Sequence, residues 1–280
     1  MARLGENQYG KSRVRLSRIT RNGDRHDFQE WNVRVLLQGD FEDSFTKADN
    51  SGVLPTDTMK NTVYSLARDS RAATIEEFAI ELGDYLLENN PQVSSVTVEI
   101  SERAWEPMIV DGKPESQTFK LEGPELQTVQ AERTRGDAWS VTSGIDGLTI
   151  LKTTNSGFEG FVRDKLTTLK PVSDRIFGTS ATATWQFTSP KPHYSAVRER
   201  VISALMKEFA LHNSKSVQHT LFDMGKAALA IAPEVSRITL TMPNLHHLLA
   251  DLSSFGQDNP NHIFVPIDEP HGYIEATIER

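Results

Sequence analysis

Two residues in the second half of this sequence could together hold a flat anion. Phe158 would offer an aromatic face and Arg175 a planar guanidinium fork, a combination that suits a heteroaromatic anion. The plainer alternatives are a core phenylalanine and a surface ion pair. Further along, His246 and His247 lie in a predicted strand whose neighbouring residues face opposite sides, so we expect only one of them to line a pocket.

Three other clusters stand at the ends of predicted elements. Lys11 opens a predicted strand, where a lone lysine is usually solvated. Thr56 and Asp57 begin a predicted helix, where both types are favoured simply as caps. Their functional interpretation is that the helix N-terminus offers free N–H groups to an anionic ligand while Thr56 supplies a hydroxyl. Gln218 also stands at a helix start, where it could merely be solvated.

The sequence lacks the common motifs for metals and cofactors. With no cysteine it has no disulfide framework, thiolate metal site or cysteine nucleophile. It contains no His-Glu-x-x-His pattern, and its eight histidines show no paired ligand spacing, so we expect no metal. No Gly-x-Ser-x-Gly elbow or glycine-rich phosphate loop occurs either. We therefore expect a protein without a cofactor.

Composition narrows the class of protein. The 280 residues are 38% hydrophobic and 24% charged, which is typical of a globular chain. A net charge of −8 without a long Lys/Arg run disfavours nucleic acid as a partner. No apolar run matches a bilayer, no secretory signal is visible, and the last residues form no peroxisomal tripeptide. We expect a cytoplasmic protein without a membrane partner.

Periodicity predicts the elements that must position these residues. A hairpin is expected over residues 14–37, followed by helices from Asp57 and from Thr74, the latter with Glu77 as a capping box. A long loop is expected over 106–124 and a strand over 126–134. In the second half we expect strands over 139–154 and 180–189, helices over 197–209 and 217–231, and strands over 235–249 and 263–278.

The segment 91–100, PQVSSVTVEI, is echoed by 233–242, PEVSRITLTM, half a chain length later. A period this long indicates two tandem domain-sized modules, which we place at 1–136 and 137–280. Strands at both ends of each module with a helix pair between them predict an α+β fold, with antiparallel sheets and helices on one face. Such sheets have free edges, so we expect copies to associate into a barrel.

Several of these motifs together resemble the urate oxidase (uricase) family. The resemblance spans nearly the whole chain in order and rests on YGK at 9–11, TDT at 56–58, LTILKTT at 148–154 continuing to Arg175, and PNLHH at 243–247. The long central run is the most specific of these. Two departures are visible: Leu166 replaces a usual aromatic residue, and Leu54-Pro55 replaces a common Val-Ala pair before Thr56.

The resemblance implies two tandem tunnelling-fold modules assembled as a homotetramer with a tunnel, and sites at subunit interfaces. It implies cofactor-free oxidation of urate by O2 and water to 5-hydroxyisourate and hydrogen peroxide. Lys11, Thr56 and His246 would form a proton relay, and Asn244 would help to hold O2 or water. The remaining family positions would bind the purine, with Thr56 and Asp57 coming from a neighbouring subunit: Phe158 by stacking, Arg175 and Gln218 at its polar edge, and Val217 through its backbone.

Two alternatives from other classes stay open on the sequence. One is another tunnelling-fold enzyme acting on a pterin or purine, such as a pterin synthase or cyclohydrolase, which typically uses a His-rich or Cys/His zinc site. The other is a non-catalytic purine-binding protein that keeps the fold. Urate-dependent O2 uptake together with a metal assay separates the three.

Overall fold

The computed structural model describes residues 2–189 and 191–280, so Met1 and Pro190 lie outside the described residues. The chain divides into two compact units, one comprising Met1–Ile145 with Gln186–Ser195 and the other Asp146–Trp185 with Ala196–Arg280. Each unit combines antiparallel strands with helices, which confirms the predicted α+β class. The module boundary expected after residue 136 stays a prediction.

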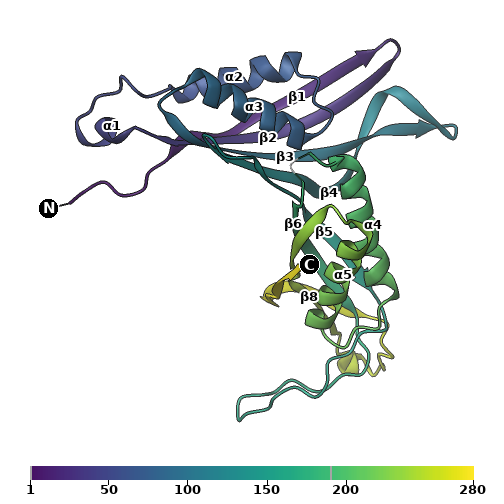
Figure 1. Cartoon of the computed structure of the whole chain (residues 1–280). Coiled ribbons are helices and arrows are strands. Elements are labelled where there is room, and N and C mark those ends of the chain that lie inside the picture. Colours follow the sequence, from purple (N-terminus) through teal and green to yellow (C-terminus); the bar gives the residue numbers. More distant parts are fainter. Residues whose placement is uncertain (1, 190) are drawn as a thin grey trace. The chain divides into compact units, whose positions relative to one another are not determined.

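The first unit is a four-stranded antiparallel sheet in the order β1-β2-β3-β4. Two helices, α2 and α3, cover one face of this sheet (Figure 1). The predicted order of two strands, two helices and two strands is confirmed, with one additional short helix, α1. The elements are β1 (Tyr9–Asn22), β2 (Arg25–Gly39), α1 (Glu42–Thr46), α2 (Thr56–Asp69), α3 (Ile75–Asn89), β3 (Val93–Val110) and β4 (Lys113–Thr134).

The core of this unit lies between the sheet and the helix pair. Along β2 the side chains of Val33 and Val35 are fully buried while Arg34 is exposed, as the alternation of a half-buried strand requires. The Trp31 ring stacks on Phe78 of α3 with centroids 4.9 Å apart. This apolar layer fixes α2 and α3 on the sheet and thereby fixes the start of α2.

The predicted capping box at the start of α3 is confirmed. Thr74 accepts a hydrogen bond from the backbone N–H of Glu77, and the Glu77 side chain accepts one from the Thr74 N–H. Two N–H groups that the helix leaves without intrahelical partners are thereby satisfied.

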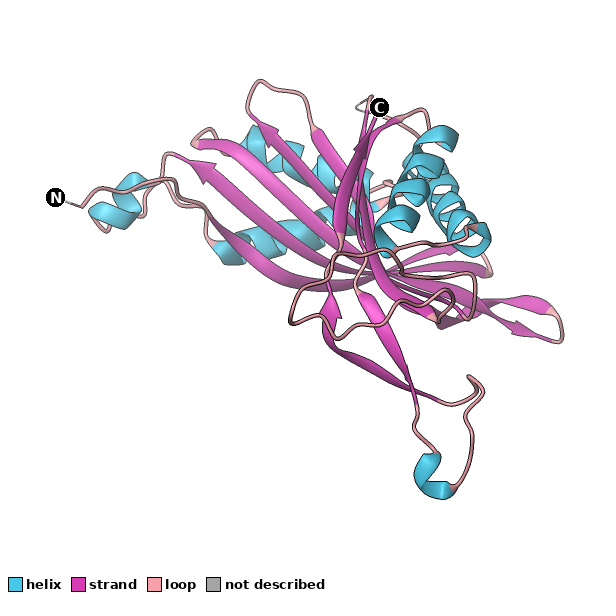
Figure 2. Cartoon of the chain, turned by 90° about the horizontal axis from the view of Figure 1, so that it is seen from below, coloured by secondary structure: helices cyan, strands magenta, loops and turns pink. Residues whose placement is uncertain are grey.

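The second unit carries its strands in the order β5-β6-β7-β10, and β8 pairs with β6 and β9. Helices α4 and α5 lie side by side (Figures 1 and 2). None of the helices within residues 2–189 and 191–280 has the length and apolar character needed to cross a bilayer. The elements are β5 (Ser140–Lys152), β6 (Phe177–Phe187), α4 (Tyr194–Leu211), α5 (Val217–Ile231), β7 (Val235–Thr241), β8 (Asn244–Leu249), the 3-10 helix η1 (Ser253–Phe255), β9 (Phe264–Gly272) and β10 (Glu275–Glu279).

Two arginines, one in each unit, make matching contacts with the two copies of the echoed segment. Arg135 donates hydrogen bonds to three carbonyls around the end of α3 and the start of β3, those of Leu87, Asn90 and Val93. Arg280 donates to three carbonyls at the matching positions around α5 and β7, those of Leu229, Ala232 and Val235. The duplication visible in the sequence therefore extends to the way each helix-to-strand connection is held.

The loop expected over 106–124 is wrong, because β3 and β4 continue through it to a tight turn. Their pairing runs as far as Val110 opposite Lys113. The two residues between them, Asp111 and Gly112, both have positive φ, at 49° and 76°. Two such residues form the type of turn that matches the twist of a hairpin. The polar composition of this segment reflects its exposure rather than a lack of strand structure.

The single strand expected over 235–249 is in fact two strands, β7 and β8, interrupted at Met242 and Pro243. Proline has no N–H to donate to a strand ladder, so it ends the pairing of β7. The strand expected over 263–278 is likewise divided, into β9 and β10. The break after β7 releases β8 to pair with β6 and β9, and β8 carries Asn244 and His246.

Candidate active site

A cavity of about 860 Å³ opens in the second unit, and all of its lining residues belong to that unit. It collects six of the residues singled out in the sequence, namely Phe158, Arg175, Val217, Gln218, Asn244 and His246. His247 lines it as well. Pockets of several hundred Å³ with a few convergent polar groups are the usual binding sites of small molecules.

The loop after β5 holds Phe158 through backbone pairing. The Phe158 N–H donates to the Val172 carbonyl at 2.7 Å, and the return bond is 3.1 Å long. The Phe158 ring stacks on Phe161 with centroids 5.0 Å apart and planes 9° apart. Gly157 must be a glycine here, because a Cβ would lie 2.8 Å from the Ser173 carbonyl oxygen. The ring at the cavity wall is therefore positioned by main chain on one side and by an aromatic neighbour on the other.

Asp174 and its hydrogen bonds place Arg175 beside that ring. Its carboxylate accepts from the Thr154 hydroxyl at 2.7 Å and from the Ser156 N–H at 3.2 Å. The Arg175 N–H in turn donates to the Ser156 carbonyl at 2.7 Å. The guanidinium carbon then lies 5.7 Å from the centre of the Phe158 ring.

The Arg175 side chain is half-buried, and its buried Nε is not hydrogen-bonded. Its Nε has no hydrogen-bond partner among the residues that the structure describes. Burial lowers the pKa of this guanidinium from its ordinary value, although the group remains a cation. A buried N–H donor without a partner costs free energy unless a ligand accepts from it, so Arg175 is suited to bind an anion in the cavity.

The start of α5 supplies the opposite wall. Ser216 caps the helix by accepting from the His219 N–H at 3.1 Å, which leaves Val217 and Gln218 as the first helical residues. N–H groups at this position have no partner within the helix. Ser214 ties this end to the Phe158 loop, because its carbonyl accepts from the Gly157 N–H at 2.8 Å. The two walls are thus connected through the main chain.

Strand β8 contributes the polar end of the cavity. The amide nitrogen of Asn244 lies 3.4 Å from Nδ1 of His246. Burial lowers the pKa of His246, and the charges of Arg175 and His271 lower it further. The expectation that only one of the two adjacent histidines lines a pocket is wrong, since His246 and His247 both do. The two histidines pair in regular register with β9, opposite Ile267 and Pro266, so the cavity reaches both faces of this short strand.

The other predicted site residues, Lys11, Thr56 and Asp57, belong to the first unit. Asp57 accepts from Lys60 Nζ at 2.5 Å and from Asn61 at 3.0 Å. The pKa of Asp57 is lowered mainly by Lys60, and the charge of Lys11 contributes. Strand β1, which carries Lys11, packs against α2, which begins at Thr56.

Tyr9 and Gly10 explain how these neighbours are held. The Tyr9 hydroxyl donates to the Leu54 carbonyl at 3.1 Å and accepts from the Leu54 N–H at 2.9 Å, which fixes the segment before Thr56. A Cβ on Gly10 would lie 1.8 Å from the Val35 carbonyl oxygen, so only glycine allows β1 to approach β2 here. Pro55 directly precedes Thr56, the first residue of α2. The main chain at the first departure, Leu54-Pro55, is thus held by Tyr9. At the second departure, the Leu166 side chain is 78% exposed and therefore contributes little to the core.

Sequence reasoning missed a second polar group in the second unit. His212, His219 and Asp223 each offer a potential metal-ligating atom, and these atoms lie within 4.8 Å of one another. The signal was present as a carboxylate and a histidine four residues apart at the end of α4 and again at the start of α5. A search for paired histidines alone does not detect it.

Comparisons with known proteins agree on one family. The model of the uricase family matches residues 7–132 and 141–275. The uricase of Arthrobacter globiformis is 42% identical over 99% of this chain and 90% of its own length. The uricase of Dictyostelium discoideum is 39% identical over 100% of this chain and 98% of its own length. The crystal structure of the Arthrobacter globiformis uricase superposes with a TM-score of 0.94 at 41% identity, covering 100% of this chain and 96% of that one.

Proposed function

This chain belongs to the uricase family and oxidises urate in purine degradation, and from that premise we propose how its residues perform the reaction. The feature that supports the site most directly is Arg175, whose guanidinium lies beside the Phe158 ring and whose buried Nε has no partner in the part of the chain that the structure describes. A planar purine anion fits both groups, because it can stack on the ring while its polar edge accepts from the guanidinium.

The proposed reaction uses urate, O2 and water and needs no cofactor. Urate loses two electrons to O2, and water adds to the oxidised ring at C5. The products are 5-hydroxyisourate and hydrogen peroxide. One water supplies the new hydroxyl, and its released proton together with one from urate balances the peroxide. The enzyme then has to hold the ring, remove a proton from it and place water on one face.

The second unit is proposed to hold the ring. Phe158 stacks on the purine, and Arg175 and Gln218 bind its polar edge, with the N–H of Val217 as a further donor. Each of these groups is positioned by main-chain hydrogen bonds or a helix start rather than by a flexible side-chain network. Binding in a defined orientation is worth several orders of magnitude in rate when the reacting atoms are aligned.

The proton relay is proposed to run through Lys11, Thr56 and His246, with Asn244 holding O2 or water. The hydroxyl of Thr56 can accept a proton and donate one at the same time, so it can connect urate to Lys11. The neutral form of His246 is favoured by its burial and by the positive charge of Arg175. A neutral imidazole can accept the proton that water releases as it attacks.

Lys11 and Thr56 are proposed to act on the urate held by a neighbouring subunit of a homotetramer, together with Asp57. Lys11 lies on β1, which is the terminal strand of its sheet in the described chain. An unpaired strand edge is a template for pairing with another copy. Large apolar side chains such as Val162, which is 93% exposed, also favour self-association.

The test is urate-dependent O2 uptake with equal release of hydrogen peroxide in chelator-treated protein. We expect turnover in that sample, and we expect Lys11→Met and Thr56→Ala to lower kcat by about 10²-fold or more. Lys113→Met, at the exposed β3–β4 turn, is the matched control and retains turnover. Full turnover in either relay variant contradicts the relay, and urate binding without peroxide contradicts the oxidase assignment.

A further inference from the structure

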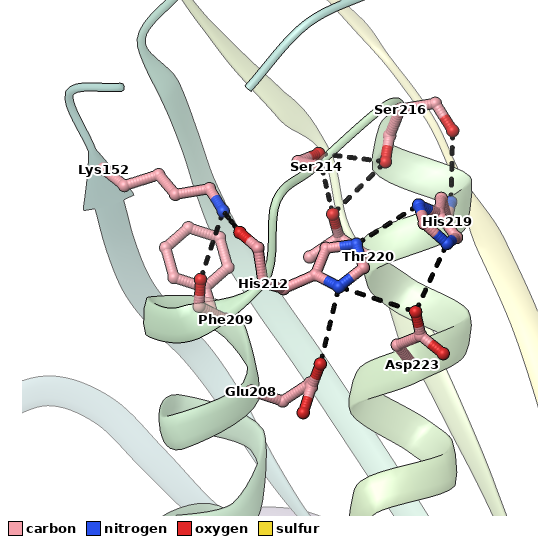
Figure 3. Close-up of polar contacts among 9 residues, drawn as sticks. All are labelled: Lys152, Glu208, Phe209, His212, Ser214, Ser216, His219, Thr220 and Asp223. Atoms are coloured by element: carbon pink, nitrogen blue, oxygen red, sulfur yellow. Dashed lines mark hydrogen bonds and ion pairs between the residues drawn. The ribbon is translucent and has the colours of Figure 1, made fainter. Parts of the chain in front are cut away.

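A cluster of four side chains joins the end of α4 to the start of α5, outside the cavity. We call Glu208, His212, His219 and Asp223 the α4–α5 cluster (Figure 3). Asp223 Oδ2 lies 3.5 Å from Nδ1 of His212 and 3.3 Å from Nε2 of His219. Glu208 Oε1 lies 3.4 Å from the same Nδ1 of His212. Asp223 therefore contacts both imidazoles, and Glu208 adds a second carboxylate next to Nδ1 of His212.

The helical spacing brings these residues together. Glu208 precedes His212 by four residues and His219 precedes Asp223 by four, so each pair shares one helix face. The two faces meet because the connection between the helices is only a few residues long. A change of one residue in either spacing would point a ligand away from the group.

The backbone around the cluster is held by bonds of its own. Lys152 Nζ donates to the His212 carbonyl at 2.5 Å and to the Phe209 carbonyl at 3.3 Å (Figure 3). Ser216 caps α5 through the His219 N–H, and the Thr220 hydroxyl donates to the Ser214 hydroxyl at 2.7 Å. These contacts fix the main chain on both sides of the cluster, so its side chains are positioned before any ligand arrives.

Hydrogen bonding does not satisfy the two rings of His212 and His219 while both are neutral. Besides their contacts with Asp223, Nε2 of His212 lies 3.2 Å from Nδ1 of His219. Three contacts in series, carboxylate to ring, ring to ring and ring to carboxylate, need three hydrogens. Two neutral imidazoles carry only two, since each has one N–H and one lone pair. While both rings are neutral, at least one contact therefore places a lone pair against another; a proton on one ring supplies the missing hydrogen, and a cation held by the two nitrogens that face Asp223 is the alternative.

We propose that the α4–α5 cluster binds one zinc ion through His212, His219 and Asp223, with Glu208 or water as the fourth ligand. Separations of 3.3 and 3.5 Å between ligand atoms match the edge of a tetrahedron with zinc bonds of about 2.0 Å, an edge of about 3.3 Å. Imidazole with carboxylate suits zinc rather than magnesium or calcium, which prefer oxygen ligands alone. The two carboxylates balance the charge of the ion.

The side chains also allow entry and adjustment. His212 is 10% exposed, whereas His219 is 49% exposed, so the ion reaches the cluster from the His219 side. When both rings bind zinc, the 3.2 Å contact between them opens by rotation of the more exposed His219 ring. The bound ion connects α4 to the first turns of α5, which stabilises this connection. Binding itself is independent of urate turnover.

The experiment titrates zinc into the full chain after chelator treatment and desalting, with a competing chromophoric chelator to measure stoichiometry and affinity. We expect one zinc per chain, no comparable magnesium binding, and a rise in Tm on zinc addition. His219→Gln and Asp223→Asn are expected to weaken zinc binding by about 100-fold and to abolish the Tm rise. His193→Gln, which removes an exposed histidine outside the cluster, is the matched control with unchanged binding.

A cobalt titration of the unaltered chain keeps the test independent of how the variants fold. Cobalt bound by nitrogen and oxygen in a tetrahedron gives intense visible absorption, which we expect to reach its maximum at one ion per chain and to be displaced by zinc. Zinc binding that is substoichiometric, or equal in His219→Gln, Asp223→Asn and the unaltered chain, overturns the proposal. Octahedral cobalt absorption overturns the proposed ligand geometry.

Discussion

Arg175 destabilises the fold and at the same time is suited to bind an anion. Its Nε is buried without a partner among the described residues, and its backbone is held through Ser156. A buried unsatisfied donor opposes folding, and an anionic ligand that accepts from it recovers that free energy on binding. The same side chain lowers the pKa of His246, so it influences both the binding of the ring and the protonation of a neighbouring group.

We expect Arg175→Gln to raise KM for urate and to lower kcat/KM by about 10- to 100-fold, which corresponds to one lost hydrogen bond to a charged group. Steady-state O2 uptake measures this change. Arg163→Gln is the matched control, because Arg163 lies in the same loop and donates to the Leu169 carbonyl rather than lining the cavity. Equal kinetics for Arg175→Gln and the unaltered chain would remove Arg175 from the site.

The protonation of His246 gives a prediction about pH. Because the pKa of His246 in the folded protein lies below the ordinary value of 6.5, the unfolded chain binds more protons between those two values. The contribution of neutral His246 to the free energy of unfolding is therefore complete above pH 6.5, and it decreases as the pH falls through 6.5 towards the folded pKa. An NMR titration of the His246 ring should give a midpoint below 6.5 that rises in Arg175→Gln. A midpoint that does not move in that variant would exclude the proposed charge effect.

At the scale of elements, the loop after β5 depends on Gly157. In Gly157→Ala the new Cβ would lie 2.8 Å from the Ser173 carbonyl oxygen and 3.0 Å from that of Val172, and neither main-chain atom can move freely. We expect a loss of roughly 1–3 kcal/mol in stability and a raised KM, because Phe158 shifts with the loop. Chemical denaturation and kinetics measure the two effects. Gly5→Ala, where a Cβ meets nothing within 4 Å, should leave both unchanged.

Elements with strong local signals could be predicted from the sequence. The capping box of Thr74 and Glu77 correctly placed the start of α3, because capping is a property of adjacent residues. The β3–β4 hairpin could not be predicted to its tip. Its exposed residues mix polar side chains with apolar ones such as Ile109, and only the pairing on both sides of Asp111-Gly112 shows that they form strands. The interruption between β7 and β8 could have been predicted from Pro243, since proline has no N–H to donate between strands.

The candidate site could likewise be predicted only in part. Six predicted residues meet in one cavity. This grouping could be predicted only through the resemblance to a family, because no local sequence pattern shows which distant residues come together. The joint lining by His246 and His247 could not be predicted, because strand alternation does not show that a cavity reaches both faces of a short strand. The α4–α5 cluster depends on how two helices meet, so its two mixed pairs carry meaning only once the helices are placed side by side.

At the scale of the whole molecule, duplication separates a shared framework from specialised residues. Arg135 and Arg280 hold equivalent connections in the two copies. The proposed functional groups are not equivalent: Lys11 and Thr56 belong to the first unit, and the six cavity residues belong to the second. In our proposal each unit carries part of the site, which is the arrangement expected of an enzyme that works only as an assembly.

Mixing two variants of low kcat/KM, assayed at urate concentrations below KM, tests whether neighbouring subunits share the proposed site. Thr56→Ala damages only the contribution of the first unit, and Arg175→Gln only that of the second. If each site combines units from two chains, a mixed pair of chains has one intact site, and random mixing should restore about a quarter of the original activity. Mixing Thr56→Ala with Lys11→Met is the matched control, because both changes damage the same unit and no combination repairs it. No recovery in the first mixture, once mass spectrometry has shown that the chains exchange, would mean that each chain completes its own site.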